Sequence, residues 1–182
     1  QAFKHFLYYF PEMPVPQVIT FISGFNQSVV TADNILGIGL DNYLGIDCEY
    51  YTRLGINAYQ KYTMRPEMIP VDCMQAWALM EFPNTDSSET LLSQMLYSGK
   101  LLYFMQAMIP DRPDSMLIGY SKSQYTWCEK NQKQMWIYLI ENKLLFSTDF
   151  MNVNKFINNG PYSKDFSRES PGSSCAQHLY SP

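Results

Sequence analysis

The chain has 182 residues, which is enough to bury a substantial hydrophobic core. Hydrophobic residues make up 46% of it and aromatic residues 15%, which excludes a disordered protein because so much apolar surface offsets the conformational entropy lost on folding. The net charge is −4 and acidic and basic residues are interleaved, so no basic stripe exists to neutralise phosphates and we expect no nucleic-acid partner.

The first 48 residues are predicted to form a helix and a small antiparallel sheet. Residues 2–10 are dense in aromatic side chains and favour a helix, with a buried strand as the alternative. The runs 17–23, 28–31 and 34–40 predict three short strands, the first of which is β-branched and apolar, with a turn at Gly24-Phe25-Asn26 after it. Glycine within a strand often marks a bulge or the close approach of another backbone or a ligand, and the third strand contains two, Gly37 and Gly39.

Residues 49–160 are predicted to be mainly helical. One or two short helices occupy 49–63, interrupted near Gly55, and another helix runs over about 72–82. The capping-box pattern Asp86-x-x-Glu89 predicts a long amphipathic helix over 87–108.

A second capping-box pattern, Ser121-x-x-Gln124, predicts a long helix that continues to about Leu145. A short helix over 150–158 ends near Gly160, a residue type common just after a helix. Residues 161–182 are rich in Ser, Pro and Gly, so we expect an irregular tail. The whole chain is predicted to be one α+β domain with its strands first.

Few histidines are available for catalysis or metal binding, since the chain holds only His5 and His178. An HExxH zinc site needs two histidines four residues apart on one helix face, and no such pair exists. GxSxG and GxxxxGK[ST] motifs are absent too. We therefore expect two ordinary surface histidines, no metal, no cofactor and no nucleophilic triad.

The four cysteines are far apart and form no CxxC pair: Cys48, Cys73, Cys128 and Cys175. Small buried residues are the favoured interpretation, with disulfides as the alternative, and a chain of this size does not need disulfides to fold.

Acidic residues leave room for a hydrolase of another kind. Paired carboxylates can perform acid–base catalysis when their environments separate their pKa values. The candidates are Asp41, Asp47, Glu49 and Glu81. Nothing in their spacing selects a pair, so solvated surface carboxylates are the favoured interpretation.

Several blocks of the sequence together resemble a known family. They are PEMPVPQVITFISGF, VVTADNILGIGLDNYLG, RPEMIPVDCMQAWALMEFP, the long block from TLLSQMLYSGKLLYF to LLFSTD, and FINNGPYSKDFSRESPG. In this order, from about residue 8 to Gly172, they are similar to the GldB-type gliding-motility lipoproteins. The resemblance implies an exported protein, lipid-anchored on the periplasmic side of the cell envelope, whose anchor lies outside this sequence. The family's closing pattern is replaced after Gly172 by SSCAQHLYSP.

That family in turn resembles predicted zinc-dependent proteases with HExxH on a central helix, which implies a zincin-like helical domain. In this chain Tyr97 stands at the first histidine, Ser98 at the glutamate and Leu101 at the second histidine. These side chains cannot jointly bind zinc or activate its water. Between them, Gly99 is interpreted as close packing against the strand NILGIGL or as the approach of a ligand, and Lys100 as a solvated or a groove-facing residue.

The remnant groove is predicted to comprise residues 97–101 together with Asp41 and Tyr43 of the LGIGLDNYLG block. The resemblance thus implies a non-catalytic lipoprotein with a binding or assembly role and an envelope protein or peptide as partner. A structural subunit without any groove is a further hypothesis.

Overall fold

The computed structural model describes residues 1–157, 166 and 170. They divide into two compact units, each of which is described by itself. The first comprises Gln1–Pro83 and Phe104–Gly119, and the second comprises Asn84–Tyr103 and the described residues from Tyr120 onward. The predicted single domain stays a prediction.

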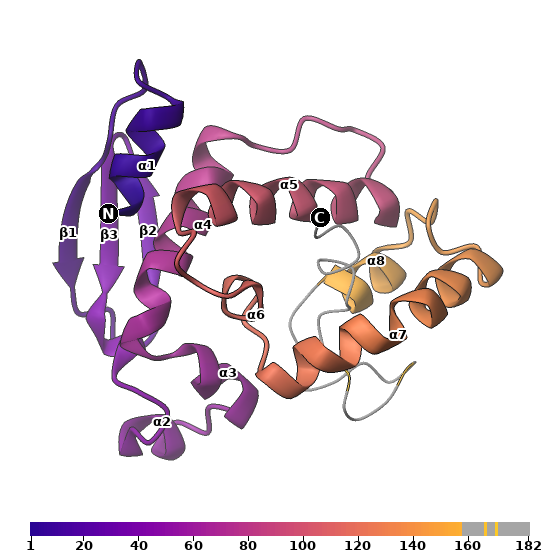
Figure 1. The fold of residues 1–182 in the computed structure, drawn as a ribbon. Coiled ribbons are helices and arrows are strands. Elements are labelled where there is room, and N and C mark those ends of the chain that lie inside the picture. Colours follow the sequence, from indigo (N-terminus) through magenta and orange to yellow (C-terminus); the bar gives the residue numbers. More distant parts are fainter. Residues whose placement is uncertain (158–165, 167–169, 171–182) are drawn as a thin grey trace. The chain divides into compact units, whose positions relative to one another are not determined.

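The first unit contains a sheet of three strands, β1 (Gln17–Phe21), β2 (Val29–Ala32) and β3 (Ile35–Gly39). Their order is β1-β3-β2, with β3 in the middle (Figure 1). The pairing of β2 with β3 is antiparallel, as predicted, whereas β1 pairs with β3 in parallel. The sheet is therefore mixed, and the predicted all-antiparallel arrangement is wrong.

A tight hairpin explains this strand order. Ala32 pairs with Ile35, so Asp33 and Asn34 alone connect β2 to β3. Their φ angles of 24° and 66° are those of the left-handed residues in a two-residue hairpin turn. With β2 bound along one edge of β3, β1 occupies the opposite edge, and the chain between β1 and β2 passes the end of β3.

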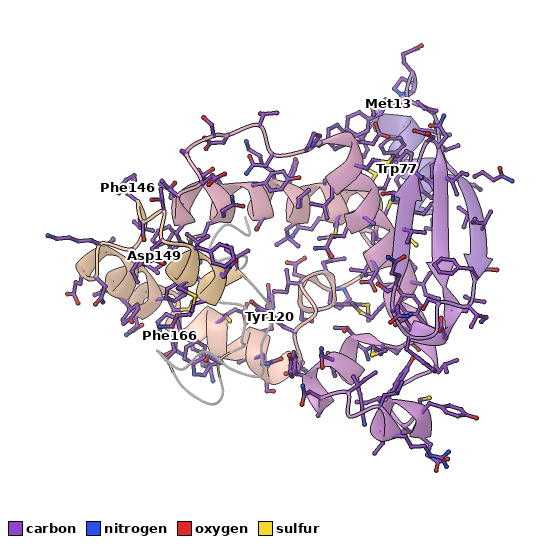
Figure 2. The ribbon with its side chains drawn as sticks, turned by 180° about the vertical axis from the view of Figure 1, so that it is seen from behind. Met13, Trp77, Tyr120, Phe146, Asp149 and Phe166 are labelled. Atoms are coloured by element: carbon purple, nitrogen blue, oxygen red, sulfur yellow. The ribbon has the colours of Figure 1, made fainter. Side chains whose placement is uncertain are left out.

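Two helices contribute aromatic side chains to the core of the first unit, α1 (Ala2–Tyr9) and α4 (Ile69–Glu81). Helix α1 confirms the helix predicted over 2–10. Helix α4 packs on β2 and β3, and its fully buried Trp77 contacts the rings of Phe3 and Phe6 (Figure 2). It begins three residues before the predicted 72, because Pro70 fits the first turn of a helix, where its missing N–H has no partner to lose.

His5 on α1 is not the ordinary surface residue that we predicted. Its Nδ1 donates a hydrogen bond of 2.8 Å to the carbonyl oxygen of Met108, and the contact is partly buried. The ring therefore fixes α1 to the end of a helix far along the chain. His178 lies outside the described residues.

Short helices complete the first unit. The predicted helices over 49–63 are confirmed as α2 and α3, and Gly55 between them has a φ of +71°, which favours glycine. The bounds are η1 (Leu40–Tyr43), α2 (Glu49–Arg53), α3 (Ala58–Thr63), η2 (Pro66–Met68) and α6 (Asp114–Leu117).

Helix α5 (Leu91–Met108) begins four residues after the predicted Ser87. Thr90, not Asp86, caps it, because the Thr90 Oγ1 accepts a hydrogen bond from the N–H of Ser93. The Asp86 carboxylate instead accepts from the Ser88 N–H and the Ser93 hydroxyl. The capping-box interpretation of Asp86-x-x-Glu89 is therefore wrong, and Glu89 has a left-handed φ of 49° that no helix contains.

The other long helix confirms its predicted cap. Helix α7 (Lys122–Glu141) starts with Ser121 and Gln124 bonded reciprocally, side chain to backbone in both directions. It ends before the predicted Leu145. Helix α8 (Phe150–Ile157) confirms the predicted short helix.

The α+β fold class is confirmed. No helix among the described residues is long and apolar enough to cross a membrane. Gly160 and all but two residues of the predicted irregular tail lie outside the described residues.

Candidate binding site at the turn after β3

The carboxyl end of β3 is crossed by the loop that leads from β1 to β2. The N–H of Gly39 donates to the carbonyl oxygen of Ser28 over 2.8 Å. A Cβ at Gly39 would lie 2.2 Å from the carbonyl oxygen of Gln27, a distance that no real Cβ tolerates. The sequence prediction of a close backbone approach at this glycine pair is confirmed at Gly39, and the approaching backbone belongs to the same chain.

Asp41, two residues further on, holds the crossing loop with its carboxylate. The loop turns at Gly24 and Phe25, whose φ angles of 68° and 64° are left-handed. The carboxylate accepts the N–H of Ser23 at 3.0 Å, the Ser23 hydroxyl at 3.1 Å and the N–H of Phe25 at 2.7 Å. Burial of Asp41 raises its pKa, but these hydrogen bonds outweigh the burial and hold the pKa below its usual value.

The neighbouring side chains add further hydrogen bonds to the turn. The Asn42 side-chain amide donates to the carbonyl oxygen of Gln27 and to the Ser23 hydroxyl, both at 2.9 Å. The hydroxyl of fully buried Tyr51 donates to the carbonyl oxygen of Asp41 and accepts the N–H of Leu44. The polar groups of Asp41 and Asn42 are thus directed inward, where they stabilise backbone that lies outside the regular sheet.

Tyr43 connects the same turn to α4. Its hydroxyl donates to the Oδ2 of Asp72 over 2.7 Å. Burial and the nearby Asp72 charge raise the pKa of Tyr43, so the phenol stays protonated. Burial also raises the pKa of Asp72 to about 6, against a smaller lowering by the hydrogen bond from Tyr43.

Asp72 was missed by the sequence analysis. The available signal was a single carboxylate in the apolar run that opens α4, IPVDCMQAW. A charged residue in the first turn of a half-buried helix needs a partner, and Tyr43 is that partner. The adjacent Cys73 is buried, and burial followed by the Asp72 charge raises its pKa to about 12, so its thiol is not a nucleophile at neutral pH.

Several exposed side chains around this turn are apolar, next to the exposed charged residues Asp47, Glu49 and Arg53. Tyr50 is 59% exposed and Leu44 is 53% exposed, and the ring of Tyr50 stacks on Phe25 of the crossing loop. We define the turn surface as the exposed apolar residues Ile22, Leu40, Leu44, Ile46, Tyr50 and Leu54. These six residues are available for apolar contact with a partner.

The four carboxylates proposed for a hydrolase lie in different environments. Asp41 is buried and saturated with donors, Asp47 is exposed, and Glu49 forms a 2.6 Å ion pair with Arg53 on the solvent-facing side of α2. Glu81 is half-buried in the last turn of α4.

The five residues predicted as the remnant of a zinc motif, 97–101, all lie on α5, in the second unit, whereas Asp41 and Tyr43 belong to the first. Tyr97 and Ser98 are half-buried, Gly99 and Leu101 are buried, and Lys100 is exposed, which agrees with its solvated interpretation. Burial raises the pKa of Tyr97. The grouping of all seven residues into one groove stays a prediction.

Metal-binding side chains are not grouped in the part of the chain that the structure describes: no three His, Cys, Asp or Glu residues there are placed to hold an ion. Cys73 and Cys128 are buried, in agreement with the favoured interpretation, and Cys48 is half-buried. Cys175 lies outside the described residues.

A comparison with protein families shows to which family the chain belongs. A family model described as gliding motility protein GldB matches residues 1–176. The chain belongs to the GldB family. It is therefore a gliding-motility-associated lipoprotein of the cell envelope, and the resemblance of the LGIGLDNYLG block is confirmed at the level of the family. A comparison with curated proteins and one with solved structures found no match.

In this GldB-family chain, the fold assigns a structural role to that block. Gly39 admits the crossing loop, Asp41 and Asn42 bind it, and Tyr43 ties the turn to Asp72. These residues can hold the turn surface in a single conformation.

Proposed function

We propose that this GldB-family chain is a non-catalytic component with a binding or assembly role on the periplasmic side of the envelope. The observation that carries the proposal is a contrast at the turn after β3, between polar groups used inside the chain and apolar side chains exposed to solvent. The carboxylate of buried Asp41 accepts hydrogen bonds from donors of its own chain, while the segment that follows it carries exposed apolar residues such as Leu44 and Tyr50. A partner would contact apolar side chains, a tyrosine among them, and would not contact the Asp41 carboxylate as a general base.

An envelope protein or peptide is the partner class that this surface suits. Its exposed members carry no charge, so affinity would come from burial of apolar area, at roughly 25 cal/mol for each Å² removed from water. The left-handed turn at Phe25, held by Asp41, would present the surface without an ordering cost on binding.

The degenerate protease scaffold is the second part of the proposal. Tyr97, Ser98 and Leu101 replace the residues of a zinc motif on α5, and none of them supplies an imidazole or carboxylate. Elemental analysis of the purified full-length lipoprotein tests this part. We expect no stoichiometric zinc, and one tightly bound zinc per chain would overturn the proposal.

A carboxylate-based hydrolase is the second candidate, and one observation favours it. Asp72 has its pKa raised to about 6 by burial, in the range of a general acid or base near neutral pH. Its Oδ2 is, however, engaged by the Tyr43 hydroxyl at 2.7 Å. Peptide hydrolysis by the wild type that disappears in Asp72→Asn and persists in Asp47→Asn would establish this candidate in place of the binding role.

A further inference from the structure

In the part of the chain that the structure describes, strand β1 is an edge strand without the usual protections against pairing. Its residues Gln17–Thr20 are all exposed and Phe21 is half-buried. It pairs with β3 through five consecutive positions, so it contains no bulge. Natural edge strands are usually blunted by charge, by an internal proline, by a bulge or by a covering element. Here the helix that packs on the sheet contacts β2 and β3, and the strands face the viewer without a helix over them in Figure 2.

The hydrogen-bonding groups of the free edge can be assigned from the parallel register. The N–H of Gln17 donates to the carbonyl oxygen of Asn34, so Gln17 directs its backbone groups toward β3. Because successive residues of a strand alternate in direction, Val18 and Thr20 direct theirs away from the sheet. Both are therefore ready to bind another strand without disturbing the β1–β3 ladder.

The amino-acid composition of strand β1 favours a second copy of the same strand as its partner. No charged residue lies between Glu12 and Asp33, so two copies of β1 can approach each other without charge repulsion. The exposed side chains of the strand are β-branched or polar, a composition suited to cross-strand contact with a copy of itself. A two-fold interface also needs nothing that the chain does not already carry, since the same patch serves both partners.

We propose that β1 binds β1 of a second copy in antiparallel fashion and joins the two sheets into one of six strands. The two-fold axis passes between the two Thr20 residues, which exchange both backbone hydrogen bonds, and Val18 lies opposite Ile22 of the copy. In such a hydrogen-bonded pair the two Thr20 Cα atoms are about 5.5 Å apart. The inference goes beyond the proposed binding role, because β1 is distinct from the turn surface except at Ile22.

Lipid anchoring favours this contact. The paired segment is short, so we expect a reversible dimer in dilute solution rather than an obligate one. Members of a lipoprotein family share one membrane surface, which raises the effective concentration of one copy toward another.

A charge-swap experiment tests the register. Thr20 is exposed and its backbone N–H and C=O point away from β3, so Thr20→Lys and Thr20→Glu are expected to fold. Each places two like charges at the two-fold axis and should weaken self-association by about tenfold or more, as measured by analytical ultracentrifugation. An equimolar mixture of the two variants should recover the dimer, because lysine then faces glutamate. Ala32→Lys, on the exposed end of the opposite edge strand, is the control and should associate like the wild type.

Three outcomes of these measurements would overturn the proposed dimer. A wild type that stays monomeric at high concentration overturns the proposal, and so does a Thr20→Lys variant that dimerises as tightly as the wild type. A mixture of the two charged variants that fails to associate also overturns it. Capture of an envelope partner by the monomeric Thr20→Lys variant would leave the proposed function standing while the dimer is tested by itself.

Discussion

The Tyr43 hydroxyl donates a 2.7 Å hydrogen bond to the Oδ2 of Asp72 and thereby joins the turn after β3 to the first turn of α4. The two residues are 29 positions apart in the chain. The bond places an ionisable carboxyl in a largely buried position, where its charged form is disfavoured. The stability of the first unit should therefore depend on pH through Asp72.

Asp72→Asn is predicted to remove this pH dependence. The pKa of Asp72 is raised from 3.8 to about 6 in the folded chain, so the folded state holds the proton more tightly than the unfolded state. Its contribution is fully present below about pH 4 and is lost as the pH rises to about 6, a change of about 2 to 3 kcal/mol. Urea unfolding from pH 4 to pH 7 should show this loss in the wild type and not in Asp72→Asn.

The Asp72→Asn variant should also be the more stable protein at pH 7, because its amide still accepts from Tyr43 and carries no charge to bury. Asp47→Asn, at an exposed carboxylate, is the matched control and should follow the wild type. Parallel curves for the wild type and Asp72→Asn would contradict the prediction.

Asp41→Asn is predicted to cost about 2 to 3 kcal/mol of folding free energy at neutral pH. The carboxylate accepts the N–H groups of Ser23 and Phe25 on separate oxygens, and an amide offers only one oxygen to the pair. One partly buried donor would then lose its acceptor. Thermal or urea unfolding measures the loss, and Asp47→Asn again serves as the control, with a change within about 0.5 kcal/mol. Equal stability of the two variants would refute the structural role of Asp41.

Two glycines of β3 should differ in their tolerance of a methyl group. At Gly37 the new Cβ would meet the Cγ2 of Val30 at 2.7 Å and the Phe21 ring at 3.1 Å, which are side-chain atoms that can move. At Gly39 it would meet the carbonyl oxygen of Gln27 at 2.2 Å, which moves only with the crossing loop. Gly39→Ala should therefore destabilise the chain by about 3 kcal/mol and Gly37→Ala by about 1 kcal/mol.

Adding Val30→Ala should restore stability to Gly37→Ala and leave Gly39→Ala unchanged. Differential scanning calorimetry of the three single variants, Val30→Ala included, and the two double variants measures this coupling. The reverse order of the two glycine substitutions would show that the loop does not cross β3 as described.

Ser121→Ala is predicted to destabilise the second unit by about 1 kcal/mol. The Ser121 hydroxyl accepts the N–H of Gln124 at the start of α7, and the Gln124 side chain accepts the N–H of Ser121 in return. Ser123→Ala, two residues along the same helix, removes a hydroxyl that accepts no backbone N–H from α7 in the described contacts. Circular dichroism during thermal unfolding should therefore separate the two variants.

The elements that local chemistry specifies were predictable from the sequence. Helix α7 followed from the Ser121–Gln124 pair, and the break between α2 and α3 followed from Gly55. Helix α5 was placed four residues early, because the carboxylate of Asp86 bonds to Ser88 and Ser93 in the preceding loop rather than opening a helix. The patterns Asp86-x-x-Glu89 and Ser121-x-x-Gln124 look alike in the sequence. They differ in the groups to which their side chains are hydrogen-bonded in the folded chain.

The sheet order and the turn after β3 could not be predicted, since both depend on contacts distant in the chain. Parallel pairing of β1 with β3 requires the loop from Ser23 to Gln27 to pass the end of β3, and no local pattern predicts such a crossing. Asp41 was singled out as part of a groove, whereas its carboxylate binds that loop. The partnership of Tyr43 with Asp72 likewise becomes visible only when η1 and α4 are side by side.

The most direct test of the account is affinity capture of partners from the native envelope by the full-length lipoprotein and two surface variants. Leu44→Asp places a charge on the turn surface, and Ile140→Asp does the same at a similarly exposed apolar residue of α7. We predict that the wild type and Ile140→Asp recover the same gliding-motility components in equal amounts and that Leu44→Asp recovers at most about a tenth as much. Equal recovery by all three would contradict a binding role for the turn after β3.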